Sequence, residues 1–301
     1  MNIKLYYHIY KYMLSFLLSL FSFSNINNTL FIQNHNAKNL SYQVEENQFI
    51  NQNYINEFSP TTSHLIMNNL TDNLIQFNEK ESIPFHKDWR NKYKVSSVKN
   101  QLKCGACWAF SSSEAVESAW AIKYNQLYNL SQQELIDCST TYGNQGCHGG
   151  SMNAAFQYII ENGLCTNLSY PYIASEQSCQ QSNCKSIVNI TEYQNIMPNS
   201  EKILQKATYQ QPVSVAIQAN KRSFQLYKSG IYSDLNCGTQ LDHGVLVIGY
   251  GYDPNYNMKY WIIKNSWGTN WGENGYIRIQ KDIENEKGLC GIAMQPSIPI
   301  I

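Results

Sequence analysis

The sequence predicts an α+β protein in which a helical half is followed by a β half. Two observations lead to this prediction. Between Cys107 and Asn162 apolar residues recur at helical intervals, and after Pro212 short β-branched or aromatic runs are separated by Gly, Asn and Pro. Helices and strands that are segregated along the chain are typical of α+β folds with two lobes. A groove between two such lobes is a favoured place for a functional site.

The helical half is predicted to contain three helices. Residues 107–124 include no Gly or Pro, so they are expected to form one long helix. Ser131 and Glu134 have the spacing of a capping box, which begins a second helix that runs through Cys138. A third helix is expected over 151–160, before an Asn-Gly pair. Antiparallel strands are expected over 213–217, 245–248, 260–263 and 276–279.

Composition excludes several classes of protein. The chain has 301 residues, which suits one or two domains. Hydrophobic residues make up 43% and charged residues 15%, and this balance is opposite to that of a disordered chain. Lys plus Arg number 22 and Asp plus Glu number 22, without a basic run. We therefore expect no nucleic-acid partner.

The N-terminus resembles a targeting signal. Lys4 and Lys11 both precede an apolar run over 13–21. Ser22 and Ser24 follow this run at the spacing of a signal-peptidase cleavage site. A transmembrane helix needs about 20 apolar residues, which this run and all later segments lack. We predict a signal peptide over 1–24, the alternatives being a buried helix or an uncleaved anchor. The expected location is a lysosome, another acidic vacuole or the exterior, where disulfides form.

A boundary in composition separates residues 25–82 from residues 83–301. The first segment has no cysteine and a net charge of −4, whereas the second holds all nine cysteines and has a net charge of +2. Residues 25–82 are interpreted as a removable pro-segment or a plain linker, and residues 83–301 as the functional domain. Glycosylation sequons, typical of secreted proteins, stand at Asn27, Asn39, Asn69, Asn129, Asn167 and Asn189.

The motif Cys104-Gly105-Ala106-Cys107 has three possible interpretations. It could be a redox dithiol, or half of a zinc site completed by Cys147 and His148. It could also carry a nucleophile, because Cys107 stands at the start of a predicted helix. Unpaired N–H groups and the helix dipole favour a thiolate at that position.

A thiolate nucleophile also needs a histidine and a group that orients it. His243 directly precedes a predicted strand, which would hold its ring at the edge of a rigid sheet. Asn265 follows the next strand and could accept a hydrogen bond from the imidazole. Trp267 beside it could shield that bond from water. The combination indicates nucleophilic catalysis more strongly than any one of these residues does.

With these motifs the chain resembles the papain family of cysteine peptidases, of the cathepsin L-like type. The resemblance extends from Ile83 to Ile301, and His243 lies 136 residues after Cys107. The matching blocks are Asp88-Trp89-Arg90, Val98-Lys99-Asn100-Gln101, Cys104-Gly105-Ala106-Cys107-Trp108, Gly146-Cys147-His148-Gly149-Gly150, Asp242-His243-Gly244 and Asn265-Ser266-Trp267-Gly268.

The resemblance implies a two-lobed fold, with a barrel-like antiparallel β lobe and an active-site cleft between the lobes. It implies a cysteine endopeptidase that acts on proteins or peptides as a monomer, without a cofactor or metal. Cys107 would attack as a thiolate paired with imidazolium His243 and form an acyl-enzyme. Asn265 would orient His243, and Gln101 would donate to the oxyanion hole. A catalytically silent binding protein of the same fold is the alternative.

Other roles also follow from the resemblance. Gly149 and Gly150 would bind the substrate backbone, and Trp267 and Trp271 would wall the site. The pocket for P2, the second residue before the cleaved bond, would be mainly apolar and would prefer Leu, Phe or Val. Its lining would be Met152, Ala216, Leu241, Gly244 and Gln295.

The resemblance further implies a zymogen whose own propeptide, over residues 25–82, is an inhibitor. The expected disulfides are Cys104–Cys147, Cys138–Cys179, Cys237–Cys290 and Cys165–Cys184, although eight cysteines allow 105 pairings from sequence alone. Two departures from the family pattern stand out. Leu102 occupies a position where Gly is usual, so we expect an altered oxyanion loop. Glu45–Asn51 matches the usual propeptide motif only in part.

Overall fold

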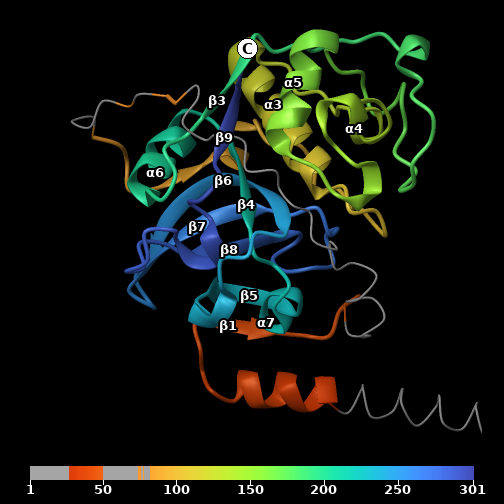
Figure 1. Ribbon diagram of the computed structural model, residues 1–301. Helices are drawn as coiled ribbons and strands as arrows, with labels where there is room; N and C mark the ends of the chain where they lie inside the picture. The colour runs from red at the N-terminus through yellow and green to blue at the C-terminus, as the bar shows by residue number, and fades with distance from the viewer. Residues whose placement is uncertain (1–26, 50–73, 76, 78–81) are drawn as a thin grey trace, which may run out of the picture.

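The structure is a computed structural model that describes residues 27–49, 74–75, 77 and 82–301 (Figure 1). The signal peptide expected over 1–24 lies outside the described residues, as does most of the stretch between 50 and 81. Within the described part of the chain, no helix has the length and apolarity needed to cross a membrane.

Three helices form one lobe, at the upper right of Figure 1: α3 (Cys107–Tyr124), α4 (Gln132–Cys138) and α5 (Met152–Asn162). The predicted long helix is confirmed with the same bounds, and the other two agree within two residues. Helix α3 contacts α4 and α5 in its own lobe, and also contacts strands of the other lobe. It is therefore the element that the two lobes share.

The second lobe is built on a sheet of nine strands in the described part of the chain. Strand order is β1-β5-β8-β7-β6-β4-β9-β3, and β2 pairs with β6. The strands are β1 (Tyr42–Val44), β2 (Lys87–Asp88), β3 (Glu192–Asn195), β4 (Val213–Ile217), β5 (Tyr227–Tyr232), β6 (His243–Asp253), β7 (Met258–Lys264), β8 (Tyr276–Gln280) and β9 (Ser297–Ile300).

The four expected strands are present as β4, β6, β7 and β8, and successive members of this set pair antiparallel. The lobe is mainly antiparallel, as expected, and one pairing differs, because β5 pairs with β8 in parallel. Local sequence does not encode this pairing. It depends on where the chain between β5 and β8 brings the two strands together.

Several elements were not expected from the sequence. They include α6 (Glu201–Gln210), α7 (Arg222–Gln225) and the short 3₁₀ helices Trp89–Lys92, Thr140–Tyr142, Gly146–His148, Gln181–Asn183, Leu235–Cys237 and Leu289–Gly291. The two halves are also less separate than the sequence indicates. Strand β2 belongs to the β lobe although it precedes the helices, and β9 returns to pair with β3.

The predicted capping box at α4 is half formed. The hydroxyl of Ser131 accepts a hydrogen bond from the Glu134 N–H at 3.0 Å. The Glu134 carboxylate does not return the bond to Ser131. It accepts instead from the Tyr158 hydroxyl at 3.0 Å and from the Cys165 N–H at 2.8 Å. These partners, distant in sequence, use the carboxylate to tie α4 to α5 and to the following loop.

Four disulfides brace the molecule, and they join the same pairs that the resemblance implied: Cys104–Cys147, Cys138–Cys179, Cys165–Cys184 and Cys237–Cys290. Cys107 is free and buried. A Cys104–Cys107 redox pair is therefore wrong, because Cys104 is bonded to Cys147. Glu134 lies close to two cysteine sulfurs, but those sulfurs are joined to each other and offer no pair of thiolates.

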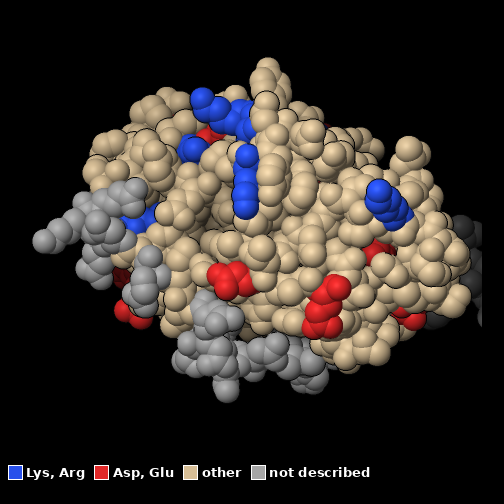
Figure 2. All heavy atoms as spheres, turned by 90° about the horizontal axis from the view of Figure 1, so that it is seen from above, with Lys and Arg blue, Asp and Glu red and all other residues tan. Residues whose placement is uncertain are grey.

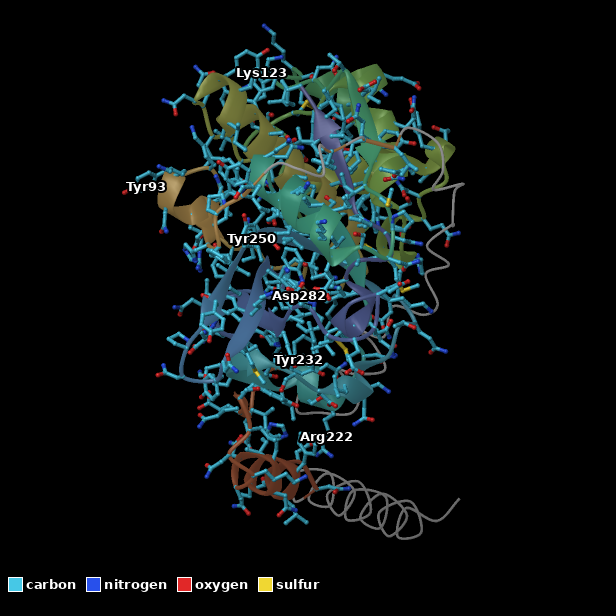
Figure 3. The ribbon with its side chains drawn as sticks, turned by 90° about the vertical axis from the view of Figure 1, so that its left-hand side faces the viewer. Tyr93, Lys123, Arg222, Tyr232, Tyr250 and Asp282 are labelled. Atoms are coloured by element: carbon cyan, nitrogen blue, oxygen red, sulfur yellow. A yellow bond between two sulfur atoms is a disulfide. The ribbon has the colours of Figure 1, made fainter. Side chains whose placement is uncertain are left out.

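The described N-terminal residues lie against the far edge of the β lobe, at the bottom of Figure 1. A helix over 27–36 precedes β1, which pairs antiparallel with β5 so that Tyr42 lies opposite Gly230. Gly230 has a φ of 94°, and a Cβ there would lie 2.3 Å from the Ser41 carbonyl oxygen. Arg222 packs over the Phe31 ring at 4.4 Å, between this helix and the sheet (Figure 3).

We predict that Ser131→Ala lowers the free energy of unfolding by about 1–2 kcal/mol, because it removes the cap of α4. The same hydroxyl also donates to the Tyr170 carbonyl at 2.7 Å, and Ser131 is fully buried. Denaturant unfolding of the disulfide-intact chain measures the change. Ser200→Ala is the control, because Ser200 caps α6 at 3.3 Å from a less buried position. If Ser131→Ala lost no more unfolding free energy than Ser200→Ala, the prediction would be contradicted.

Candidate active site

Cys107 is the first residue of α3, and its side chain is almost fully buried. Burial raises the pKa of its thiol to about 11. Backbone hydrogen bonds oppose this shift: one from Gly244 of β6, and those from Trp108 and Cys107 at the start of α3, where N–H groups stabilise a thiolate. The thiol is thus placed where anions are favoured, but in this state the loss of water dominates.

His243 begins β6, where it lies opposite Ile217 of β4. The next residue, Gly244, adjoins the nucleophile, because a Cβ at Gly244 would lie 3.2 Å from the Cys107 carbonyl oxygen. Strand β6 therefore brings His243 to the start of α3. Burial lowers the pKa of His243 to about 4, and the hydrogen bond to Asn265 acts in the opposite direction.

Asn265 directly follows β7, and its Oδ1 lies 2.8 Å from His243 Nε2. The same oxygen accepts the Ser266 N–H at 2.8 Å, which fixes the amide with its oxygen toward the ring. Nε2 of a neutral His243 consequently carries the proton, and Nδ1 is left as the acceptor. This is the tautomer that can take a proton from a thiol.

Aromatic rings cover the His243–Asn265 pair. Trp267 lies over His243 with ring centroids 4.7 Å apart. Trp271 is fully buried behind Trp267, and its Nε1 donates to the Gln225 carbonyl at 2.9 Å. Trp271 therefore supports Trp267 from the interior, whereas the resemblance assigned it to the wall of the site. Phe49, from the N-terminal segment, packs on Trp267 at 4.5 Å.

Gln101 is held by the segment that follows Asn265. Its N–H donates to the Ser266 carbonyl at 2.8 Å, and its Oε1 accepts the Ser266 hydroxyl at 2.6 Å. Its Nε2 donates one hydrogen to the Cys104 carbonyl at 3.0 Å, which leaves the second amide hydrogen for a ligand. Sequence reasoning missed Ser266, although it adjoins Asn265 in the motif.

Tyr172 is a second residue that the sequence reasoning missed. Its hydroxyl donates to the Gln101 carbonyl at 2.5 Å, and its ring packs edge-on against Phe110 of α3 at 5.0 Å. The loop that carries Gln101 is therefore tethered on both sides, by Ser266 and by Tyr172. No local pattern around Tyr172 identifies this contact.

The residues expected around the P2 pocket mostly gather in one place. Met152, Ala216 and Leu241 belong to the same apolar cluster, and a Cβ at Gly244 would lie 3.3 Å from Met152 Sδ. Gln295 is half-buried. Its neighbour Met294 lies near Leu241, since both side chains lie against Gly291.

Two glycines precede the pocket. Gly150 lies against Trp108, where a Cβ would come within 2.7 Å of the indole ring, and Gly149 has a φ of 117°. Both positions therefore require glycine for reasons of space or backbone conformation.

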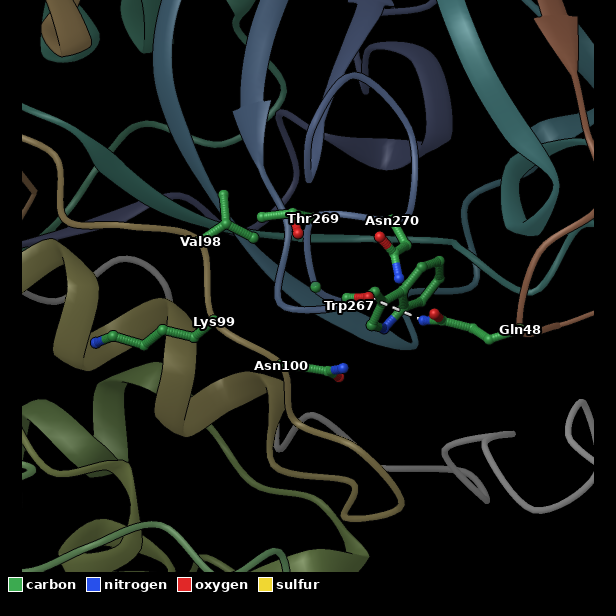
Figure 4. Close-up of a pocket in the computed structure, with 8 residues that line it drawn as sticks. Gln48, Val98, Lys99, Asn100, Trp267, Thr269 and Asn270 are labelled. Carbon is green, nitrogen blue, oxygen red and sulfur yellow. Dashed lines mark hydrogen bonds between the residues drawn. The ribbon is translucent and has the colours of Figure 1, made fainter.

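A separate hollow of about 270 Å³ lies beside Trp267, and Gln48 reaches into it to donate to the Trp267 carbonyl at 2.9 Å (Figure 4). Its other lining residues are Val98, Lys99, Asn100, Gly268, Thr269 and Asn270.

The surface carries few charges. On the face drawn in Figure 2, charged side chains are sparse and uncharged residues cover most of the area. This agrees with the charged share of 15%.

A comparison with known families shows where this chain belongs. The profile described as "Papain family cysteine protease" matches residues 83–300. The chain belongs to the papain family.

Known relatives agree with this assignment. The chain is 45% identical over 282 residues to "Probable cysteine protease RD21B" of Arabidopsis thaliana, a match that covers 91% of this chain and 59% of that protein. The chain thus spans about three-fifths of the length of this relative, and the same holds for "Cysteine proteinase RD21A" of the same plant.

Solved precursors of family members have the same fold. A recombinant stem bromelain precursor matches with a TM-score of 0.84 and 38% identity, over 92% of this chain and 89% of that one. Digestive procathepsin L 3 from the larval midgut of Tenebrio molitor matches with a TM-score of 0.81 and 36% identity, over 92% and 90% of the two chains. The papain-like fold inferred from the resemblance is confirmed.

Leu102 stands in the loop of Gln101, at a position where the papain family usually has glycine. It adopts a φ of 51°, in the left-handed region that favours glycine, and its N–H donates to Asn100 Oδ1 at 3.0 Å. The side chain is 48% exposed, so it has room. Leu102 therefore carries local backbone strain, and beside it Gln101 is held by the hydrogen bonds described above.

We predict that Leu102→Gly raises the free energy of unfolding by up to about 1 kcal/mol. A left-handed non-glycine residue costs roughly 1–2 kcal/mol, and part of the gain is lost to the greater freedom of glycine in the unfolded chain. Denaturant unfolding measures the effect. Leu102→Ala, which keeps the strain, should show no gain. A Leu102→Gly variant less stable than Leu102→Ala would refute this account.

Proposed function

We propose that this papain-family chain is a cysteine endopeptidase, with Cys107 as nucleophile and His243 as acid–base. The observation that carries the proposal is the combination of one free cysteine at a helix start with a histidine whose tautomer is set by a buried asparagine. Four disulfides occupy the other cysteines, so the chemistry has a single available sulfur.

The proposed reaction proceeds in two halves. The Cys107 thiol gives its proton to His243 Nδ1, and the sulfur attacks the peptide carbonyl carbon. The resulting oxyanion accepts hydrogen bonds from Gln101 Nε2 and the Cys107 N–H. His243 then donates its proton to the leaving amine, and a thioester remains. In the second half His243 takes a proton from water and the hydroxide attacks the thioester carbon. The C–S bond then breaks, the carboxylic acid leaves, and His243 returns its proton to the Cys107 sulfur.

The protonation of the pair is proposed to change when the cleft opens. In the buried state the pKa of Cys107 is about 11 and that of His243 about 4, so both groups are neutral between these values. A proton moved from sulfur to Nδ1 creates both charges together, and their attraction offsets part of the desolvation cost. Water entering an open cleft favours the charged pair further, as does the helix dipole.

The N-terminal segment is proposed to be an inhibitory propeptide. Its described residues occupy the surface beside the site: Asn47 donates to the Gln225 carbonyl at 2.9 Å, and Phe49 covers Trp267. After the stretch outside the described residues, Ile75 donates to the Asn195 carbonyl at 3.1 Å. Removal of residues 25–82 would free the Trp267 face. Precursors and proforms among the matched structures support a zymogen.

Several finer points remain proposals on the same basis. The substrates are proteins or peptides with Leu, Phe or Val at P2, because the Met152–Ala216–Leu241 cluster is apolar. The working chain is residues 83–301, delivered by the secretory route to an acidic compartment or the exterior. Exposed sequons such as Asn129 and Asn189 are candidates for glycosylation.

Thiol labelling tests the proposed nucleophile. In the intact chain at pH 5, iodoacetamide should alkylate Cys107 very slowly, because a pKa of about 11 leaves almost no thiolate; the rate should rise with pH toward 11. After proteolytic removal of the residues before Ile83, labelling at pH 5 should become fast, as expected for a thiol with a pKa below about 7.5. Mass spectrometry locates the label.

Cys107→Ser is the matched control, and it should lose both labelling and peptide hydrolysis. A processed chain that neither labels at pH 5 nor hydrolyses peptides would instead be the silent binding protein. Fast labelling of the intact chain at pH 5 would contradict the closed neutral state.

Peptide substrates test the P2 proposal. We predict that kcat/KM for P2-Leu exceeds that for P2-Arg by at least about tenfold, because an apolar pocket offers no counter-charge. Gln295→Glu should narrow this ratio if residue 295 reaches the pocket. Equal kcat/KM for the two substrates in the wild-type chain would exclude an apolar preference at P2. An unchanged P2-Leu to P2-Arg ratio in Gln295→Glu would show that residue 295 does not reach the P2 pocket.

A further inference from the structure

Four charged side chains, three of them buried and one partly buried, connect α3 to the segments that carry the proposed catalytic residues. Lys264 ends β7 and directly precedes Asn265. Its Nζ lies 2.9 Å from Glu114 Oε1 and donates to the Ser96 hydroxyl at 2.9 Å. The Lys264 side chain is 0% exposed and that of Glu114 is 3% exposed. This ion pair joins the β lobe to the central helix of the helical lobe.

The other two charges hold the loop that leads to Gln101. Lys99 Nζ lies 2.6 Å from Glu117 Oε1, and the Ser96 hydroxyl donates to Glu117 Oε2 at 2.5 Å. Glu117 also accepts the Leu130 N–H at 2.7 Å. Ser96 thus stands between the two ion pairs, because it accepts from Lys264 and donates to Glu117.

The positions of these residues along the chain give the network its meaning. Glu114 and Glu117 lie about two and three turns after Cys107 on the same helix. Lys264 is one residue from Asn265, and Lys99 is two residues from Gln101. The segments of Asn265 and of Gln101 therefore meet on one face of α3, the helix that begins with Cys107.

The network is balanced, with two cations and two carboxylates. Buried charges are costly, and well-packed apolar residues often replace a buried ion pair without loss of stability. Hydrogen bonds to charged groups are directional, however, and here Ser96 accepts one from Lys264 and donates one to Glu117. Such a network is therefore expected to affect geometry more than stability.

We propose that Lys264 and Glu114 are positioning residues for the peptidase reaction. Their ion pair fixes the end of β7 against α3, and so holds Asn265, and through it the His243 ring, in register with Cys107. The proposal rests on the proposed function. The Lys99–Glu117 pair acts in the same way on a different group, since it holds the loop of Gln101 and not the histidine.

The two pairs predict different signatures, which a merely structural role would not produce. In the double variant Glu114→Gln/Lys264→Met, the processed chain should lose about 10–100-fold in kcat with KM nearly unchanged, because the acid–base group is displaced. Alkylation of Cys107 by iodoacetamide at pH 5 should slow by a similar factor. In Lys99→Met/Glu117→Gln, kcat should fall while alkylation keeps its wild-type rate.

Double variants are used because a single substitution leaves one buried charge without a partner and risks misfolding. Lys259→Met is the matched control: Lys259 lies on the same strand, and its ion pair with Asp282 at 2.8 Å is exposed. It should change neither reading. Circular dichroism and the melting temperature verify the fold of each variant.

A folded Glu114→Gln/Lys264→Met variant with wild-type kcat and wild-type alkylation would overturn the proposal. Equal loss of alkylation in both double variants would also overturn it, because it would indicate a general loosening of the cleft. A wild-type chain that labels at pH 5 but hydrolyses no peptide would refute the proposed function alone, since the alkylation comparison still reads the position of His243.

Discussion

The burial of α3 between the two lobes is the constraint on which the rest of the structure depends. Most residues of this helix are buried, including polar ones such as Ser111, Glu114 and Glu117. Each of these must find a partner, because a buried polar group without one is costly. Ser111 donates to the Val245 carbonyl of β6 at 2.7 Å, which ties the helix to the strand that His243 begins.

The same burial determines the chemistry of the site. It places the Cys107 sulfur at the N-terminus of a helix and removes it from water at the same time. The first effect favours a thiolate and the second opposes it, and the buried state has a pKa of about 11. In the proposed reaction, Cys107 is therefore inert while covered and gains reactivity when water enters. Phe49 of the N-terminal segment packs on Trp267, and Trp267 packs on the His243 ring. An N-terminal residue thus lies one ring away from His243.

Interactions of different kinds hold each lobe together and join the two lobes. Disulfides close loops within the helical lobe and the β lobe, as Cys104–Cys147 and Cys237–Cys290 do. Neutral hydrogen bonds between Ser266 and Gln101 connect the segment after β7 to the loop before α3. The charged network beneath them adds direction. Stability and geometry therefore have largely separate sources in this chain.

The sequence by itself determined the elements and residues whose signals are local. Helix α3 has its predicted bounds because no Gly or Pro interrupts it, and Cys107, His243 and Asn265 stand at the predicted ends of elements. The half-formed capping box of Ser131 shows the limit of this reasoning. The Glu134 carboxylate accepts hydrogen bonds from Tyr158 and Cys165, which are distant in sequence, and not from the Ser131 N–H. Only the tertiary structure decided the parallel pairing of β5 with β8, the partners of Gln101 and the ion pair of Lys264 with Glu114. These contacts join residues tens to more than a hundred positions apart, and burial sets their strength. Neither the distance in space nor the exclusion of water is written in a local pattern.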